Sequence, residues 1–155
     1  MESNYTASSN FATIEPIDFW LPVVVVLAFN FLFFIFAQQQ KDNSWIDTFW
    51  GLTFIEPIAA LIIAKLIAGE PIPARTWLIF AMVTCWGLRL ALYIGLRHKT
   101  EDFRYQDMRK RWMEGGYCAY VTKAFFYVFM AQGIYSIICN AACLYVVIAG
   151  PNDAL

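Results

Sequence analysis

Two ionisable residues lie inside apolar stretches of this sequence and are its first candidates for chemistry. Glu56 interrupts the apolar stretch 52–68, and Arg89 interrupts the apolar stretch 77–96. An ionised side chain inside a hydrocarbon layer costs roughly 2.5–3.5 kcal/mol on insertion scales, so it usually faces protein or water and has a partner. Glu56 lies about one helical turn, and Arg89 about two turns, from the same side of the predicted membrane. We therefore predict an intramembrane ion pair between Glu56 and Arg89.

This predicted pair has two interpretations. It either locks two neighbouring helices together, or it lines a polar cavity that opens toward the charged segment after residue 96. Intramembrane charge suggests function, but structural ion pairs also occur. The spacing alone favours the structural interpretation.

A dense charged segment follows directly after the stretch that holds Arg89. Six of the eleven basic residues fall within fifteen positions, interleaved with Glu101, Asp102 and Asp107. Basic residues beside a membrane helix attract anionic lipid headgroups, although a solvated helix that only anchors the topology has the same composition. The predicted headgroup contacts are Arg97, Lys99, Arg104, Arg109, Lys110 and Arg111.

No other reactive constellation is visible. The four cysteines form no CxxC pair and His98 is the single histidine, which argues against a metal site or a disulfide framework. We expect His98 to be a solvated residue at the interface. The sequence has no glycine-rich phosphate-binding loop, so we assign no catalytic, cofactor-binding or metal residues. A net charge of -1 gives no indication of a nucleic-acid partner.

The composition predicts the elements that must position these residues. The chain has 155 residues, of which 60% are hydrophobic and 15% charged, and its mean hydropathy is +0.53. These values are typical of an integral membrane protein. We predict one all-α membrane domain over 1–155, with four transmembrane helices and an interfacial amphipathic helix between the third and the fourth. The predicted segments are a tail at 1–18, spans at 19–37, 52–68, 77–96 and 121–149, and an interfacial helix at 100–112.

Three local features refine these elements. Pro57 is expected to interrupt and kink the second span. The fourth span is long, and it is either one tilted helix or a helix that breaks near Asn140. In the interfacial helix Thr100 is the expected N-cap, and Tyr105, Met108 and Trp112 would form its apolar stripe.

The distribution of basic residues predicts the orientation. The first loop contains Lys41, the second contains Arg75, and the third contains six basic residues. By the positive-inside rule the first and third loops face the cytoplasmic or matrix side, and both termini face the opposite side.

Three ordered motifs carry a resemblance to a known family. KDNSWIDTFWGLTF, WGLRLALYIGLR and EDFRYQDMRKRW resemble sequences of the steroid 5α-reductase superfamily, in its large branch of uncharacterised bacterial and organellar membrane proteins. The matching residues are Asp42, Ser44, Trp45, Asp47, Trp50 and Gly51, then Trp86, Arg89 and Leu90, then Glu101, Asp102, Arg104, Tyr105, Met108 and Arg109.

The resemblance implies an all-helical membrane fold. Enzymatic members of that superfamily bind NADPH from the cytoplasmic or matrix side and reduce a carbon–carbon double bond in a lipid enone. The likeness covers nearly all of this chain but only about the first half of the superfamily's domain, whereas much of the cofactor pocket comes from the later helices. The Arg97-His98 dipeptide is followed by Lys99-Thr100 and does not match the arginine-histidine-proline-asparagine-tyrosine motif of that half. Half a pocket cannot position a hydride.

We therefore expect a non-catalytic accessory subunit of a multi-subunit membrane complex of the respiratory-chain type, without a cofactor. Its expected partners are other membrane subunits and phospholipid, with cardiolipin as a candidate, and no nucleic acid. The inner mitochondrial membrane is preferred over the ER, because no secretory signal is visible and the resemblance is to a bacterial and organellar branch. The alternatives are half of a split NADPH-dependent lipid enone reductase, and a lone four-helix membrane protein.

Overall fold

A computed structural model describes residues 15–149 of the chain, so most of the predicted tail 1–18 lies outside the described residues. Within residues 15–149 all regular secondary structure is helical, and four segments are long and apolar enough to cross a membrane. This confirms the predicted fold class. The four segments are Pro16–Gln40, Trp45–Ala68, Ala74–Arg97 and Tyr117–Ala149.

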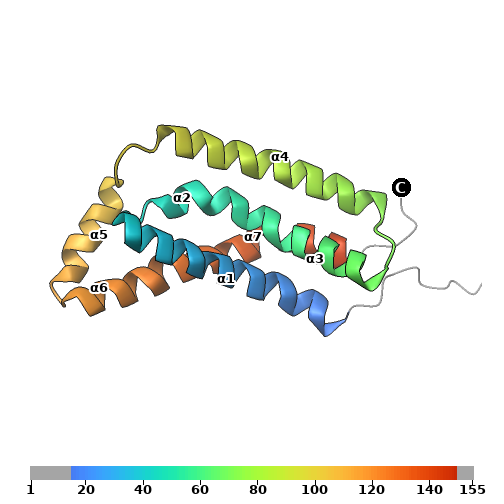
Figure 1. The fold of residues 1–155 in the computed structure, drawn as a ribbon, viewed down its shortest axis with the longest axis horizontal. Coiled ribbons are helices and arrows are strands. Elements are labelled where there is room, and N and C mark those ends of the chain that lie inside the picture. The colour runs from blue at the N-terminus through green and yellow to red at the C-terminus, as the bar shows by residue number, and fades with distance from the viewer. Residues whose placement is uncertain (1–14, 150–155) are drawn as a thin grey trace, which may run out of the picture.

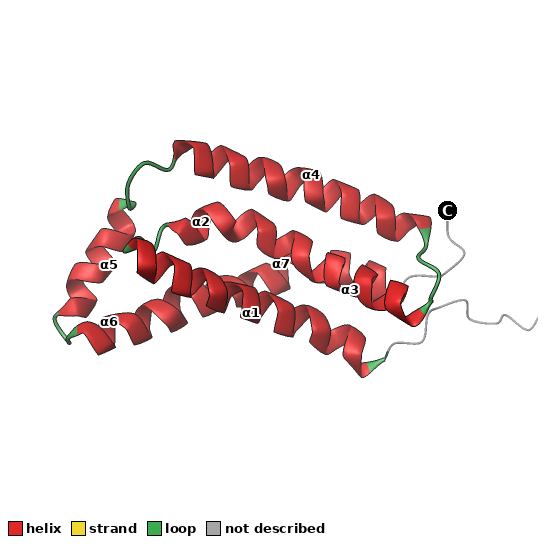
Figure 2. Ribbon diagram, in the orientation of Figure 1, coloured by secondary structure: helices red, strands yellow, loops and turns green. Residues whose placement is uncertain are grey.

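Successive segments run antiparallel to one another (Figure 1). The first segment is α1 (Pro16–Gln40), and the third is α4 (Ala74–Arg97). The second segment comprises α2 (Trp45–Phe49), η1 (Trp50–Phe54) and α3 (Ile55–Ala68). The fourth comprises α6 (Tyr117–Ala124), η2 (Phe125–Met130) and α7 (Ala131–Ala149). Helix α5 (Phe103–Met113) lies across the end of the bundle at which α1 and α4 finish. Short loops join these elements (Figure 2).

The irregular part of the second segment is a 3₁₀ helix that precedes Pro57, and the helix is regular at Pro57 itself. The segment begins at Trp45, earlier than predicted, and passes through the 3₁₀ helix η1 before α3 starts at Ile55. Pro57 therefore lies in the first turn of α3, where a missing amide hydrogen breaks no intrahelical bond. The expected kink at Pro57 is wrong for this reason.

The fourth segment continues through Asn140 without a break. Its irregularity is the π-helix η2, one turn of wider backbone between α6 and α7. The Asn140 Nδ2 atom donates a hydrogen bond of 3.0 Å to the carbonyl oxygen of Phe54, so this side chain joins α7 to the end of η1. Of the two predicted alternatives, the single helix is correct.

Helix α5 has the predicted apolar stripe but a different N-cap. The side chain of Asp102, and not that of Thr100, accepts the hydrogen bond from the Arg104 amide. Tyr105 is buried, and Met108 and Trp112 pack against the same apolar cluster. That cluster fixes α5 to the bundle through Ala37, Ile46, Val128 and Phe129.

A second apolar cluster fills the opposite half of the bundle. It joins α3 to α7, and partly buried residues of α1 and α4 cover it. Its buried members are Ile58, Leu61, Ile62, Leu144 and Val147.

Helix α4 meets η1 at a contact between two glycines. It packs chiefly against η1 and α2. A Cβ atom added at Gly51 would overlap the carbonyl oxygen of Gly87, and one added at Gly87 would overlap the carbonyl oxygen of Gly51. Only three residues of α4, namely Arg75, Thr76 and Gly87, are buried. The position of α4 therefore depends on two backbones that touch directly.

Replacing either glycine of this contact should destabilise the bundle. Gly87→Ala or Gly51→Ala places a methyl group against backbone, which cannot move aside, so we expect a loss of about 1–3 kcal/mol in unfolding free energy. Denaturant unfolding of the purified chain in detergent, followed by circular dichroism, measures this loss. Gly95→Ala is the matched control, because its methyl group would meet only the Thr48 methyl at 3.0 Å. Equal losses at Gly87 and Gly95 would contradict the glycine contact.

Candidate functional site

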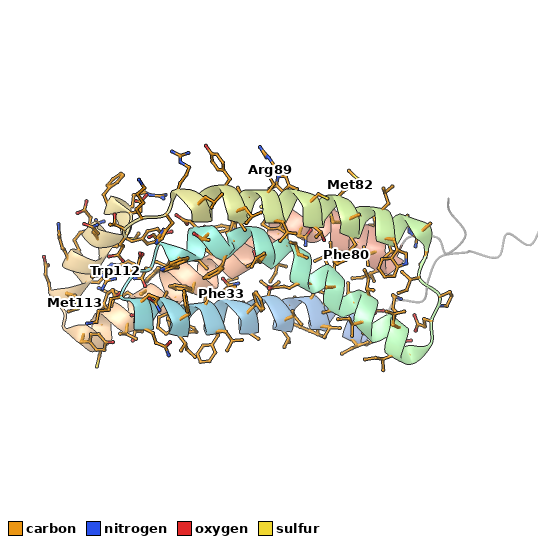
Figure 3. The ribbon with its side chains drawn as sticks, turned by 45° about the horizontal axis from the view of Figure 1, so that its top comes forward. Phe33, Phe80, Met82, Arg89, Trp112 and Met113 are labelled. Atoms are coloured by element: carbon orange, nitrogen blue, oxygen red, sulfur yellow. The ribbon has the colours of Figure 1, made fainter. Side chains whose placement is uncertain are left out.

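The predicted ion pair between Glu56 and Arg89 does not form. Both carboxylate oxygens of Glu56 are buried and accept no hydrogen bond within the described part of the chain. Arg89 is exposed on the outer side of α4 and points away from the bundle (Figure 3). The reason is the rotation of α4: Gly87 faces η1, and Arg89, two residues further, lies about 200° around the helix.

The structure instead brings together polar residues from two loops at the α5 end of the bundle. We call residues 41–44, between α1 and α2, the first loop, and residues 98–102, between α4 and α5, the third loop. The carboxylate of Asp42 lies 2.9 Å from the His98 Nε2 atom, and the His98 ring lies against Trp45 with 4.4 Å between ring centroids. The His98 side chain is only 10% exposed, so the expectation of a solvated histidine is wrong.

Ser44 extends this link between the loops. Its amide and its hydroxyl both donate to Oδ1 of Asp42, and the hydroxyl oxygen accepts a bond of 3.2 Å from the Asp102 amide. A serine nucleophile needs a base such as His98 within hydrogen-bond reach of its hydroxyl. Here the hydroxyl proton is directed to Asp42, and the arrangement fits loop fixation and not nucleophilic catalysis.

A second link is centred on Glu101. Its Oε1 atom accepts hydrogen bonds from the Asn43 amide at 2.9 Å and from Nη2 of Arg109 at 2.7 Å. The same Arg109 nitrogen lies 2.6 Å from the Lys41 carbonyl oxygen. The Arg109 guanidinium also lies over the Tyr120 ring, 5.2 Å from its centroid. Arg109, predicted to contact lipid headgroups, is thus engaged inside the protein.

A third link joins α5 to α2 through Asp47. The Tyr105 hydroxyl donates to Oδ1 of Asp47 at 2.7 Å, and Nη2 of Arg104 lies 3.0 Å from Oδ2. Burial, together with the neighbouring charge of Asp47, raises the pKa of Tyr105 above its ordinary value. The Arg104 guanidinium also donates to Asp102, and this hydrogen bond lowers the pKa of that carboxyl below its ordinary value. We call these three links together the loop network.

Arg104 is exposed despite its ion pairs, and the other four predicted headgroup residues also lie on the surface. Arg97, Lys99, Lys110 and Arg111 are exposed. Their contacts are local: Nη1 of Arg97 donates to the Tyr93 hydroxyl, and Lys110 lies 3.7 Å from the carboxylate of Asp107. Glu101 pairs with Arg109, and Arg104 pairs with Asp102 and Asp47. Lipid contact by the exposed residues remains a prediction.

A cavity of about 480 Å³ opens beside the loop network. This volume is within the range of roughly 300–1,000 Å³ that is usual for small-molecule sites. Its walls carry both signs of charge, because Arg97, Lys99 and Arg104 face it together with Asp47 and Asp102.

Sequence reasoning missed the loop network, although a signal was available. The positive-inside rule places the first and third loops on the same side of the membrane. Both loops contain carboxylates and basic residues, so ion pairs between them were a natural expectation. The sequence did not indicate which residues pair. Arg109, for example, pairs with Glu101, eight positions before it.

Comparison with known proteins identifies the family. Residues 33–155 match the family described as protein of unknown function (DUF1295), and the chain belongs to this family. No curated protein and no solved structure matches the chain.

The Tyr105 hydroxyl should contribute measurably to stability. Tyr105→Phe removes the donor to Asp47, and hydrogen bonds to charged groups contribute about 1.5–3 kcal/mol. We expect a loss of that size in the unfolding free energy, measured by denaturant unfolding in detergent. Tyr117→Phe is the control, because Tyr117 is exposed and has no hydrogen bond from its hydroxyl within residues 15–149. A Tyr105→Phe protein as stable as the control would contradict the third link.

The Asp102 carboxylate should give a pH-dependent contribution. Its pKa is lowered in the folded chain, so its stabilisation is present above the unfolded pKa and is lost as the pH falls through the folded pKa. Asp102→Asn keeps an N-cap acceptor but removes the charge. We expect the variant to be less stable than the native chain at pH 7, and we expect this difference to disappear as the pH falls through the folded pKa of Asp102. Unfolding midpoints in detergent measure both. A difference that is independent of pH would contradict the role of the charge.

Proposed function

We propose that this member of the DUF1295 family is a non-catalytic accessory subunit of a multi-subunit membrane complex, of the respiratory-chain type, in the inner mitochondrial membrane. The carrying observation is the outer side of α4, which exposes Arg89 within an apolar transmembrane segment. Such a charge facing lipid costs roughly 2.5–3.5 kcal/mol, and a neighbouring protein subunit would remove this cost. No hydrogen bond, ion pair or ring contact joins Arg89 to any residue from 15 to 149.

The loop network supports the same proposal. Its carboxylates bind partners within the chain, and in this arrangement they hold α5 across the end of the bundle. Groups engaged in this way stabilise a scaffold. The exposed residues Arg97, Lys99, Lys110 and Arg111 then provide a surface for anionic phospholipid, for which cardiolipin is the candidate, on the matrix side.

The alternative is half of a split NADPH-dependent lipid enone reductase, a role that the likeness to steroid 5α-reductases implies. The cavity beside the loop network is the observation in its favour, because Arg97, Lys99 and Arg104 could meet phosphate groups there. The fit is incomplete, since Asp47 and Asp102 face the same space and would repel phosphate. The rest of such a pocket would come from helices outside the described residues, and we place the accessory-subunit role first.

One purification separates the two functions. The protein is extracted from its native membrane in a mild detergent, and its assembly is resolved on a native gel and identified by mass spectrometry. The same fraction is then titrated with NADPH. We expect migration with a large complex and no NADPH binding. A small assembly with one other membrane chain that binds NADPH would contradict the accessory role and support the split reductase.

A further inference from the structure

We propose that the outer side of α4 is the docking surface for one transmembrane helix of a partner subunit, and that this helix carries an aspartate or glutamate opposite Arg89. The inference rests on the proposed accessory role and adds to it the site of assembly and the chemistry of the partner. It begins from a row of exposed residues along α4 that we call the outer seam. The outer seam consists of Leu78, Met82, Cys85, Arg89, Leu92 and Leu96.

The outer seam has the spacing of a helix-packing surface. Its members are separated by alternating steps of four and three residues, which is the spacing that keeps one face of a helix against a partner helix. The apolar members are extensively exposed, from 53% at Leu78 to 83% at Leu96. At 1.5 Å per residue the row is about 27 Å long, close to the thickness of a hydrocarbon core. A single transmembrane helix could therefore cover it from end to end.

The same helix packs within its own chain on the opposite side. Gly87 touches η1, and Phe80 and Val83 pack against the buried cluster of α3 and α7. Arg89 and Met82 point away from the bundle in Figure 3. The outer seam takes no part in these contacts, and it is available for another chain.

Arg89 indicates what the partner must contain. An arginine among leucines and methionine on an apolar face is stabilised by an anionic group at the same depth. One turn further along α4, the Tyr93 hydroxyl accepts a hydrogen bond of 2.6 Å from Nη1 of Arg97. A carboxylate on the docked helix would accept bidentate hydrogen bonds from the guanidinium and neutralise it.

Lipid is a poorer occupant of the outer seam. Arg89 lies eight residues before the end of α4 at Arg97, which is about 12 Å of helix. Its Cα–Cβ bond tilts toward the helix N-terminus and so leads the side chain away from the nearer membrane surface. Both features oppose snorkelling to a headgroup phosphate.

A second copy of this chain is also a poorer occupant. Two copies inserted in the same orientation hold their Arg89 residues at the same depth. A symmetric contact along the outer seam would bring the two guanidinium groups together, and like charges oppose such pairing.

Substitutions of Arg89 test the proposal in the native complex. Arg89→Met keeps a long side chain and removes the charge, Arg89→Glu reverses it, and Arg89→Lys retains it. We expect the fraction of the chain found in the large complex to fall at least about tenfold for Met and Glu, and to fall less for Lys. The isolated Arg89→Met chain in detergent should keep the native unfolding midpoint, because Arg89 has no contact inside the fold. A lower midpoint with unchanged assembly would instead assign Arg89 a role in the fold and overturn the proposal.

Photo-crosslinking identifies the occupant. A photoreactive phenylalanine analogue is placed at Leu92 in the outer seam and, as the control, at Leu32. Leu32 is exposed to a similar extent, 58% against 62% at Leu92, and it lies eight residues before the end of α1 at Gln40, as Arg89 does before the end of α4 at Arg97. We expect Leu92 to give an adduct with a partner helix that contains an acidic residue at the depth of Arg89, and Leu32 to give lipid adducts.

The other outcomes of the crosslinking overturn the docking proposal, and the native gel shows whether the accessory role fails with it. Adducts of Leu92 with lipid, with a second copy of this chain, or with a helix lacking an acidic residue at that depth would each refute it. If the chain still migrates with a large complex, the accessory role stands and only the docking surface is wrong. If the chain migrates alone, both proposals fail.

Discussion

The backbone contact between Gly51 and Gly87 fixes how α4 is rotated about its axis, and most other properties of the molecule depend on that rotation. Two backbones that touch leave no room for a side chain, so this face of α4 has to point at η1. Every other residue of α4 then has a defined direction. Arg89 is turned outward because it follows Gly87 by two positions, and Glu56 is left without the partner that its depth suggested.

The loop network is the second constraint, and it acts at the boundary of the apolar bundle. Carboxylates that accept several hydrogen bonds there are stabilised in their ionised form, as the lowered pKa of Asp102 illustrates. Asp42, Asp47 and Glu101 each bind a group from another element of the chain. The result is a junction between the first loop, the third loop and α5, in which the polar side chains bind one another.

The sequence predicted where the helices lie along the chain better than it predicted which side of each helix faces the bundle. The four spans followed from length and hydropathy. The apolar stripe of α5 followed from the helical spacing of Tyr105, Met108 and Trp112. Helix α4 is apolar on nearly every side, so its sequence contains no polar face from which to infer its rotation. The pairing of Glu56 with Arg89 relied on depth alone and failed for that reason. The small residues Gly51 and Gly87 were the only indication of the true contact. His98 is largely covered because Asp42 of the first loop and Trp45 of α2 contact it.

The two sides of α4 differ in a way that suits assembly after folding. Its inner side packs within the chain, where Gly87 touches η1 and where Phe80 and Val83 lie against the apolar cluster of α3 and α7. Its outer side combines large apolar residues with one charge, which favours a chemically specific neighbour over lipid. In membranes, independently stable helices form first and associate afterwards through packing and polar contacts. A chain organised in this way can be inserted as a stable bundle and still require one particular helix beside it.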